Sequence, residues 1–182
     1  MTKVFGIGMF KTGTKSLGEA LMMLGYKTAY WNWGVVKCDW YPTPEDIQPH
    51  LEDICGRAQH FDAFCDAPWL YAYKELDDAF PGSKFILTTR DYDDVAQSDI
   101  NMWRRDGAEP SSIPSREKFV DRIRRHEEEV KTYFEGRGND LLVINICEGE
   151  GWEKICPFLE ADLPMSPFPH RNKGPYKNEK TH

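Results

Sequence analysis

The stretch that decides the fold is VFGIGMFKTGTKSLGEALMMLGYK, residues 4–27. It opens with a short apolar run, passes through a glycine-rich segment that holds two lysines and three hydroxyls, and continues with helical periodicity. The apolar residues from Leu17 to Leu24 recur at i, i+3, i+4 and i+7, and Gly25 is suited to end the helix. The stretch therefore predicts a strand, a loop and a helix in direct succession.

The same alternation of strand and helix patterns continues along the chain. We expect strands at 4–8, 28–32, 61–65, 84–89 and 141–146, and helices near 14–25, 44–58, 69–79, 91–106, 115–135 and 150–160. This alternation indicates βαβ units, so we expect a three-layer α/β fold with a mostly parallel sheet of about five strands flanked by helices. At 182 residues the chain is expected to form one domain, 1–182. Its proline-rich, basic end has no apolar period and predicts an irregular C-terminal arm, residues 163–182.

Composition and charge exclude several classes of protein. The chain carries 30 acidic and 23 basic side chains, a formal charge of −7, which argues against bulk binding to nucleic acid or to anionic membrane. No stretch is long and apolar enough to span a bilayer, and no secretory leader pattern is seen, so we expect a cytoplasmic protein. The five cysteines are odd in number and scattered, as expected of reduced thiols.

Four possible metal ligands follow one another at intervals of five residues: His50, Cys55, His60 and Cys65. A zinc site there would have to cross a predicted helix, a loop and a strand, and the spacing matches no common ligand pattern. We therefore favour buried thiols and surface histidines over zinc, and expect no metal.

Polar groups follow three of the predicted strands at the point where each strand ends. The Lys11 loop follows the first strand, Asp66 follows the third, and Arg90 follows the fourth. In open parallel sheets, ligands bind in the crevice beyond the carboxyl ends of the strands. We therefore expect these residues, distant in sequence, to meet at one edge of the sheet.

The loop itself has the composition of a phosphate-binding turn, with backbone N–H groups at a helix N-terminus and basic or hydroxyl side chains. Its residues are Lys11, Thr12, Gly13, Thr14, Lys15 and Ser16. Gly8 and Gly13 have the separation of an ordinary P-loop, but Thr14 stands where the P-loop lysine belongs, and a lysine precedes the second glycine instead. A solvated basic turn is the alternative interpretation.

This variant loop resembles the sulfotransferases, whose strand–loop–helix reads approximately [KR]-x-G-T-x-[ST]. In KFILTTRDYDDVAQSDINMW, residues 84–103, an arginine at a strand end is followed eight residues later by a serine. The stretch EGEGWEKICPFLEADLPMSPFPHRNKG, residues 148–174, is similar to the carboxyl-terminal part of a P-loop sulfotransferase subfamily. The resemblance covers nearly the whole chain, from Phe5 to about Lys173.

The resemblance implies a P-loop-like fold and transfer of a sulfuryl group from 3′-phosphoadenosine 5′-phosphosulfate (PAPS) to a hydroxyl or amine, without a metal. The product nucleotide is adenosine 3′,5′-bisphosphate (PAP). The resemblance also implies that Lys11 faces the bridging oxygen of the departing 5′-phosphate and that residues 11–16 hold this phosphate. It further implies that the 3′-phosphate is held by Arg90 and Ser98, with Arg171 and Lys173 of the arm. Lys15 departs from better-known members, which have threonine or serine there.

The catalytic base is the residue for which the chain departs most from the family. Many cytosolic members place a histidine just beyond the strand before the arginine strand, where this chain has Asp66. Burial would raise the pKa of this carboxyl and suit it to accept a proton. The alternative is a helix N-cap ahead of Ala67-Pro68. For Arg90, the alternative is a surface cluster with Asp91, Asp93 or Asp94.

Other residues also have two interpretations. Lining an acceptor pocket and packing in the core are the two interpretations of Trp31, Trp33, Trp40, Tyr41 and Trp69. The expected acceptor is a small molecule or glycan, with aromatic acceptors included. His126 lies on the apolar stripe of a charged helix, and we interpret it as a core histidine. The arm near 168–174 either closes over Arg90 and Ser98 or is an exposed tail. The oligomeric state is left open.

Two further functions compete with sulfuryl transfer. A P-loop nucleotide kinase or NTPase would use Asp66 and Ser16 to hold Mg-ATP, but the displaced lysine argues against it and Arg90 with Ser98 would have no role. A non-catalytic module would bind PAP yet transfer nothing.

Overall fold

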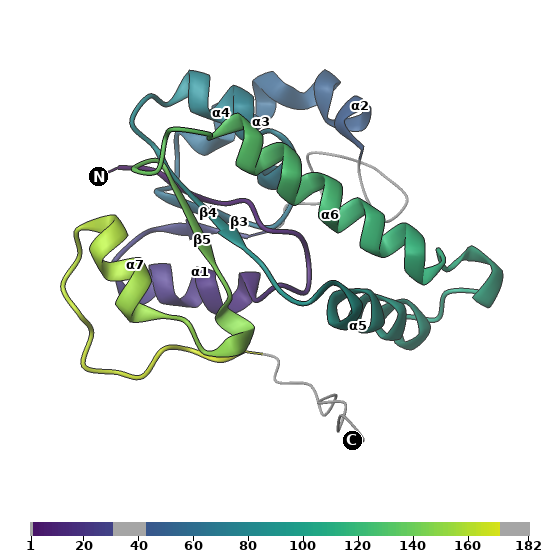
Figure 1. Ribbon diagram of the computed structural model, residues 1–182. Helices are drawn as coiled ribbons and strands as arrows, with labels where there is room; N and C mark the ends of the chain where they lie inside the picture. Colours follow the sequence, from purple (N-terminus) through teal and green to yellow (C-terminus); the bar gives the residue numbers. More distant parts are fainter. Residues whose placement is uncertain (1, 31–42, 172–182) are drawn as a thin grey trace.

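The computed structural model describes residues 2–30 and 43–171 (Figure 1). Five parallel strands form one sheet in the order β2-β3-β1-β4-β5. The strands are β1 (Val4–Gly6), β2 (Thr28–Ala29), β3 (Ala63–Cys65), β4 (Lys84–Thr88) and β5 (Leu141–Ile144). The predicted five-stranded parallel sheet is confirmed. The strands are shorter than their apolar runs because the chain leaves the hydrogen-bonded ladder before the buried residues end.

The helices follow the strands in the predicted order. They are α1 (Thr14–Met23), α2 (Pro44–Ile47), α3 (Leu51–Ala58), α4 (Tyr73–Ala79), α5 (Tyr92–Arg105), α6 (Arg116–Tyr133) and α7 (Trp152–Leu159). Short 3-10 turns lie at η1 (Gln48–His50), η2 (Trp69–Tyr71), η3 (Pro110–Ser112) and η4 (Ile146–Glu148). The helix expected over 44–58 is divided by η1, which contains Pro49; proline has no N–H for the helical hydrogen bond.

Helices cover both faces of the sheet (Figure 1). On one face Phe5, Phe64 and Phe85 form a row of rings, with centroids 4.7 and 5.4 Å apart, and pack against α3, α4 and α6. On the other face Val4 and Ile86 pack against α1 and α7. Strand residues that are neighbours in sequence therefore point to opposite apolar layers, as the period of a strand requires. The three-layer α/β fold is confirmed.

The end of β1 positions the site. The chain continues from Gly6 into the β1–α1 loop, residues 7–13, which runs directly into α1. Gly8 lies so close to the end of β4 that a Cβ there would be 1.9 Å from Thr88 Oγ1 and 2.5 Å from the Thr88 carbonyl oxygen. Only glycine allows this approach.

Candidate functional site

The three polar segments expected at the carboxyl ends of the strands do lie together. Arg90, after β4, donates a hydrogen bond from Nη1 to the Lys11 carbonyl oxygen at 3.2 Å. Asp66, after β3, lies within electrostatic reach of the ammonium groups of Lys15 and Lys11. The β1–α1 loop, Asp66 and Arg90 therefore occupy one edge of the sheet.

Buried hydroxyls fix the middle of the β1–α1 loop. Thr12 is fully buried; its Oγ1 donates to the Met9 carbonyl oxygen and lies 2.6 Å from Thr88 Oγ1. These contacts join the loop to its own start and to β4. The loop is thus ordered by the protein alone.

The backbone around the site adopts unusual conformations. Lys11 and Asp66 have φ angles of 67° and 70°, in the left-handed region that residues other than glycine rarely adopt. Gly13, at φ 100°, precedes α1. Strained non-glycine residues of this kind cluster at functional sites, where the surrounding structure holds them in place.

The N-terminus of α1 offers a binding site for an anion. The helix begins without a side-chain cap, and its first turn contains no acidic residue. The first N–H groups of a helix have no partner within it and carry the positive end of its dipole. Lys15 is exposed in this first turn, whereas Thr14 and Ser16 are buried.

The Lys11 side chain lies against α5. Its Nζ is 3.7 Å from Met102 Sδ, a weak acceptor. Burial lowers the pKa of Lys11, while the nearby carboxylate of Asp99 raises it. A stronger acceptor, such as a phosphate oxygen, would replace the sulfur contact readily.

Asp66 is a buried carboxyl that faces α1. Burial raises its pKa, as the sequence led us to expect, although a hydrogen bond from Thr14 and the charges of Lys15 and Lys11 oppose the shift. The turn η2 that follows begins without a side-chain cap, which argues against the N-cap interpretation.

Arg90 is half-buried and has two partners. Besides the Lys11 carbonyl, its Nη2 lies 3.7 Å from Asp94 Oδ2, so the predicted surface pairing exists but is loose. Ser98 lies two turns into α5 and is half-buried.

A family model described as a sulfotransferase domain matches residues 3–112 and 99–175. The chain belongs to the sulfotransferase family. A comparison with curated proteins found no match. The two matched ranges overlap and together span residues 3–175.

The C-terminal arm of this sulfotransferase folds back onto α1. The Arg171 backbone N–H donates to Ser16 Oγ at 2.9 Å, and its guanidinium pairs with Glu19. Phe168 packs against Trp152, with ring centroids 4.9 Å apart. Arg171 therefore lies beside the first turns of α1, and closure over Arg90 and Ser98 stays a prediction. Lys173 lies outside the described residues.

The aromatic candidates for an acceptor pocket separate into two groups. Trp31, Trp33, Trp40 and Tyr41 lie outside the described residues. Trp69 is only 1% exposed and packs against Phe64, with ring centroids 4.7 Å apart. Trp69 is therefore a core residue of the sulfotransferase.

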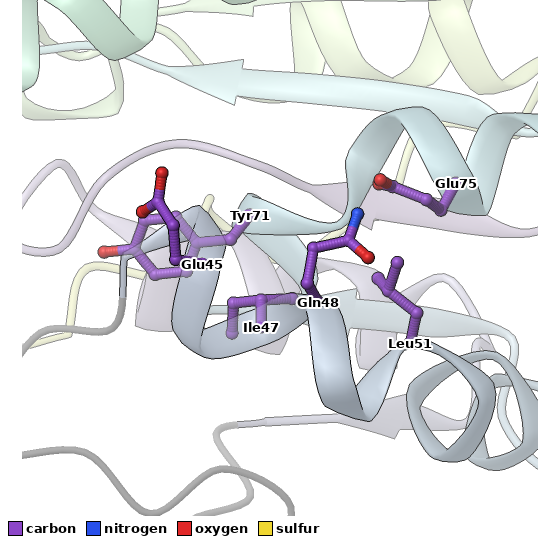
Figure 2. Close-up of a pocket in the computed structure, with 6 residues that line it drawn as sticks. All are labelled: Glu45, Ile47, Gln48, Leu51, Tyr71 and Glu75. Atoms are coloured by element: carbon purple, nitrogen blue, oxygen red, sulfur yellow. The ribbon is translucent and has the colours of Figure 1, made fainter.

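A small cavity of about 130 Å³ lies between α2 and α4 (Figure 2). Glu45 and Tyr71 flank one side of it and Glu75 with Leu51 the other, while Ile47 and Gln48 lie between them. None of these six residues belongs to the predicted site. The cavity therefore differs in composition from the predicted site, because it is lined by the carboxylates of Glu45 and Glu75 and the predicted site contains Lys11 and Lys15.

No metal site emerges from the described ranges 2–30 and 43–171, where no group of three or more His, Cys, Asp or Glu side chains is gathered for an ion. The four residues of the zinc hypothesis lie apart; Cys65, for example, is buried in the sheet. Among the described helices, none is long and apolar enough to cross a membrane.

Three contributors to the site were not predicted as such from the sequence: Thr88, Glu19 and His126, the last of which was interpreted only as a core residue. Thr88 contacts Thr12 and Gly8, Glu19 holds Arg171, and His126 is bonded to the loop. The helical spacing Ser16–Glu19 on one face of α1 is a signal that could have found Glu19. Thr88 and His126 depend on tertiary contacts that no local pattern reports.

Proposed function

We propose that this sulfotransferase transfers the sulfuryl group of PAPS to a hydroxyl or amine of an acceptor, a small molecule or glycan. The proposal rests on one observation. An uncapped helix N-terminus, two lysines, a buried carboxyl and an arginine lie together at one edge of the sheet. This set suits a ligand with phosphate groups at both ends.

The residues present fit the 5′ end of the donor. The uncapped N–H groups of α1, with Lys15 beside them, favour a phosphate at the Gly13–Ser16 turn. The left-handed conformation at Gly13 suits glycine, and a Cβ there would lie 3.2 Å from Ile146 Cβ. When bound, PAPS supplies an activated sulfuryl group and a phosphate leaving group.

Lys11 and Asp66 take the two chemical roles. Lys11 stabilises negative charge on the departing oxygen, because its ammonium can leave the weak Met102 contact for a charged oxygen. Asp66 accepts the proton of the acceptor, because burial raises its pKa toward that of a useful base. The lysines near Asp66 keep its pKa from rising further.

Arg90 and Ser98 serve the 3′-phosphate, joined by Arg171 and Lys173 of the C-terminal arm. Arg90 is fixed by its bond to the Lys11 carbonyl while part of its guanidinium remains available, since its pairing with Asp94 is loose. Arg90 thus contacts the loop that we place at the 5′-phosphate and is itself placed at the 3′-phosphate.

Thermal shift with PAP and with Mg-ATP tests the donor, because a ligand that binds only the native state raises the melting temperature. We expect stabilisation by PAP without added metal. Stabilisation by Mg-ATP alone would identify a nucleotide kinase or NTPase. An assay of PAP release from PAPS with hydroxyl and amine acceptors then separates an enzyme from a module that only binds PAP.

A further inference from the structure

His126 contacts the β1–α1 loop at its first residue. The imidazole Nε2 lies 2.7 Å from the Ile7 carbonyl oxygen. A carbonyl oxygen can only accept, so Nε2 carries the proton and donates it. Burial lowers the pKa of His126 and so favours the neutral ring, although the hydrogen bond to Ile7 and the charge of Glu129 oppose this shift.

The Ile7 carbonyl lies where strand β1 ends and the β1–α1 loop begins. Ile7 is fully buried and follows the last residue of β1, Gly6. Its N–H still donates to the Ile86 carbonyl at 2.9 Å, whereas its carbonyl turns toward α6. The His126 bond thus fixes the peptide at which the strand becomes the loop, one residue before Gly8 meets Thr88.

The imidazole is itself held in place. The rings of Tyr71 and Tyr73 lie edge-on to it, with centroids 6.5 and 6.3 Å away. One turn earlier on α6, Arg122 donates to Tyr71 Oη at 2.9 Å. Helix α6 therefore joins the segment that follows Asp66 to the loop that holds Lys11.

We propose that His126 is a positioning residue for the donor site, which acts through its hydrogen bond to the Ile7 carbonyl to fix the β1–α1 loop. This inference rests on the proposed function only for the identity of the ligand. The hydrogen bond and its effect on the loop exist in the ligand-free protein.

The test compares four variants with the wild-type protein. His126→Leu removes the donor, His126→Gln places an amide N–H near the position of Nε2, and His126→Asn carries the same amide one bond short. Val130→Ala is the matched control: Val130 is fully buried one turn further along the same face of α6 and packs in the same core as Ile7, so the variant loses packing but no hydrogen bond to the loop.

Two readouts are measured below the melting temperature of every variant: PAP affinity by calorimetry, and hydrogen exchange of residues 8–16 without ligand. We expect His126→Leu and His126→Asn to weaken PAP binding about tenfold, the effect of one lost hydrogen bond. Both should speed exchange of the loop. His126→Gln should restore both properties, and Val130→Ala should change neither.

Equal effects of Val130→Ala and His126→Leu, or of the Gln and Asn variants, would overturn the inference, because the role of His126 would then be packing alone. If His126→Leu fails to fold, the Gln and Asn variants still decide. If wild-type protein does not bind PAP, the proposed function fails, and loop exchange alone decides the role of His126.

Discussion

The β1–α1 loop and the C-terminal arm border the same helix, α1, but are held in different ways. The loop is buried and joined to β4 through Thr12, to α6 through Ile7, and to Arg90 through Lys11. The arm is exposed: Leu163 is 68% exposed, and the arm is held by Trp152 and by contacts with Ser16 and Glu19. We infer that the 5′ end of the donor meets a preformed site, whereas the arm responds to the ligand.

The largest effect on stability is expected from Gly8→Ala, which tests how tightly the loop is packed. A Cβ at Gly8 would lie 2.5 Å from the Thr88 carbonyl oxygen, so backbone must move. We expect the free energy of unfolding to fall by about 3 kcal/mol, the upper range for overpacking. Chemical denaturation measures it. Gly56→Ala in α3, where nothing lies within 4 Å, should be neutral or stabilising. Equal stability of the two variants would show that the loop is loose.

Asp66→Asn should have the largest effect on activity, a loss of kcat/KM of about 10²–10⁴-fold, because a general base is removed. In the wild-type protein the base must be ionised, and burial raises the pKa of Asp66. Activity should therefore rise with pH through an inflection above the ordinary range for aspartate, and the variant should lose this inflection. PAP affinity is the control and should change little. Retained activity would assign the base elsewhere.

Lys11→Ala should lower kcat by about 10²–10³-fold, because the ammonium stabilises charge that develops as the oxygen leaves. The change in PAP affinity should be much smaller. Steady-state kinetics and calorimetry separate the two quantities. Lys15→Ala is the matched control, since it removes a neighbouring charge that we place on the phosphate and should act mainly on affinity. If Lys11→Ala lowers affinity alone, Lys11 only binds the donor.

Much of this site follows from the order of the elements along the sequence. Polar residues after the first, third and fourth strands converge because the carboxyl ends of parallel strands share one edge. The apolar face of the long helix correctly places His126 in the core. Its hydrogen bond to Ile7, 119 residues away in sequence, could not be read from the pattern, because buried polar contacts depend on tertiary packing.

The ends of the strands and the contacts of the C-terminal arm are two further features that the sequence pattern alone did not predict. Apolar content predicts burial, and Ile7 is buried, but pairing in β1 already ends at Gly6. Basic composition of the arm suggested an anion as the partner of Arg171. The structure pairs Arg171 with Glu19, a carboxylate on the neighbouring helix that supplies the opposite charge.

Arg90→Ala sharpens the contrast between the two ends of the donor. Loss of a charge-assisted bond should weaken PAP binding by about 1.5–3 kcal/mol. Adenosine 5′-monophosphate, which lacks the 3′-phosphate, is the matched ligand. Its affinity should fall much less than that of PAP when Arg90 is replaced. Calorimetry with both nucleotides measures the difference. Equal losses would mean that Arg90 acts through the Lys11 carbonyl on the loop, and not on the 3′-phosphate.

The smallest effect concerns the arm, where Glu19 competes with the donor for Arg171. The Arg171 side chain is largely exposed and the Glu19 side chain is partly exposed, so their ion pair is weak and screened by salt. If Arg171 moves to the 3′-phosphate, it must leave Glu19. Glu19→Gln removes the competitor and should tighten PAP binding about two- to threefold, the scale of an exposed pair. Arg171→Gln should weaken binding.

Hydrogen exchange across residues 163–171, with and without saturating PAP, reports the movement directly. We expect PAP to increase protection there in the wild-type protein and in Glu19→Gln, but not in Arg171→Gln. The loop residues 8–16 serve as the internal reference, since their contacts to β4 and α6 exist before the ligand arrives and their protection should change less. Unchanged protection of the arm at saturating PAP would show that the arm is a tail held to α1 through Glu19. The 3′-phosphate would then be bound by Arg90 and Ser98 alone.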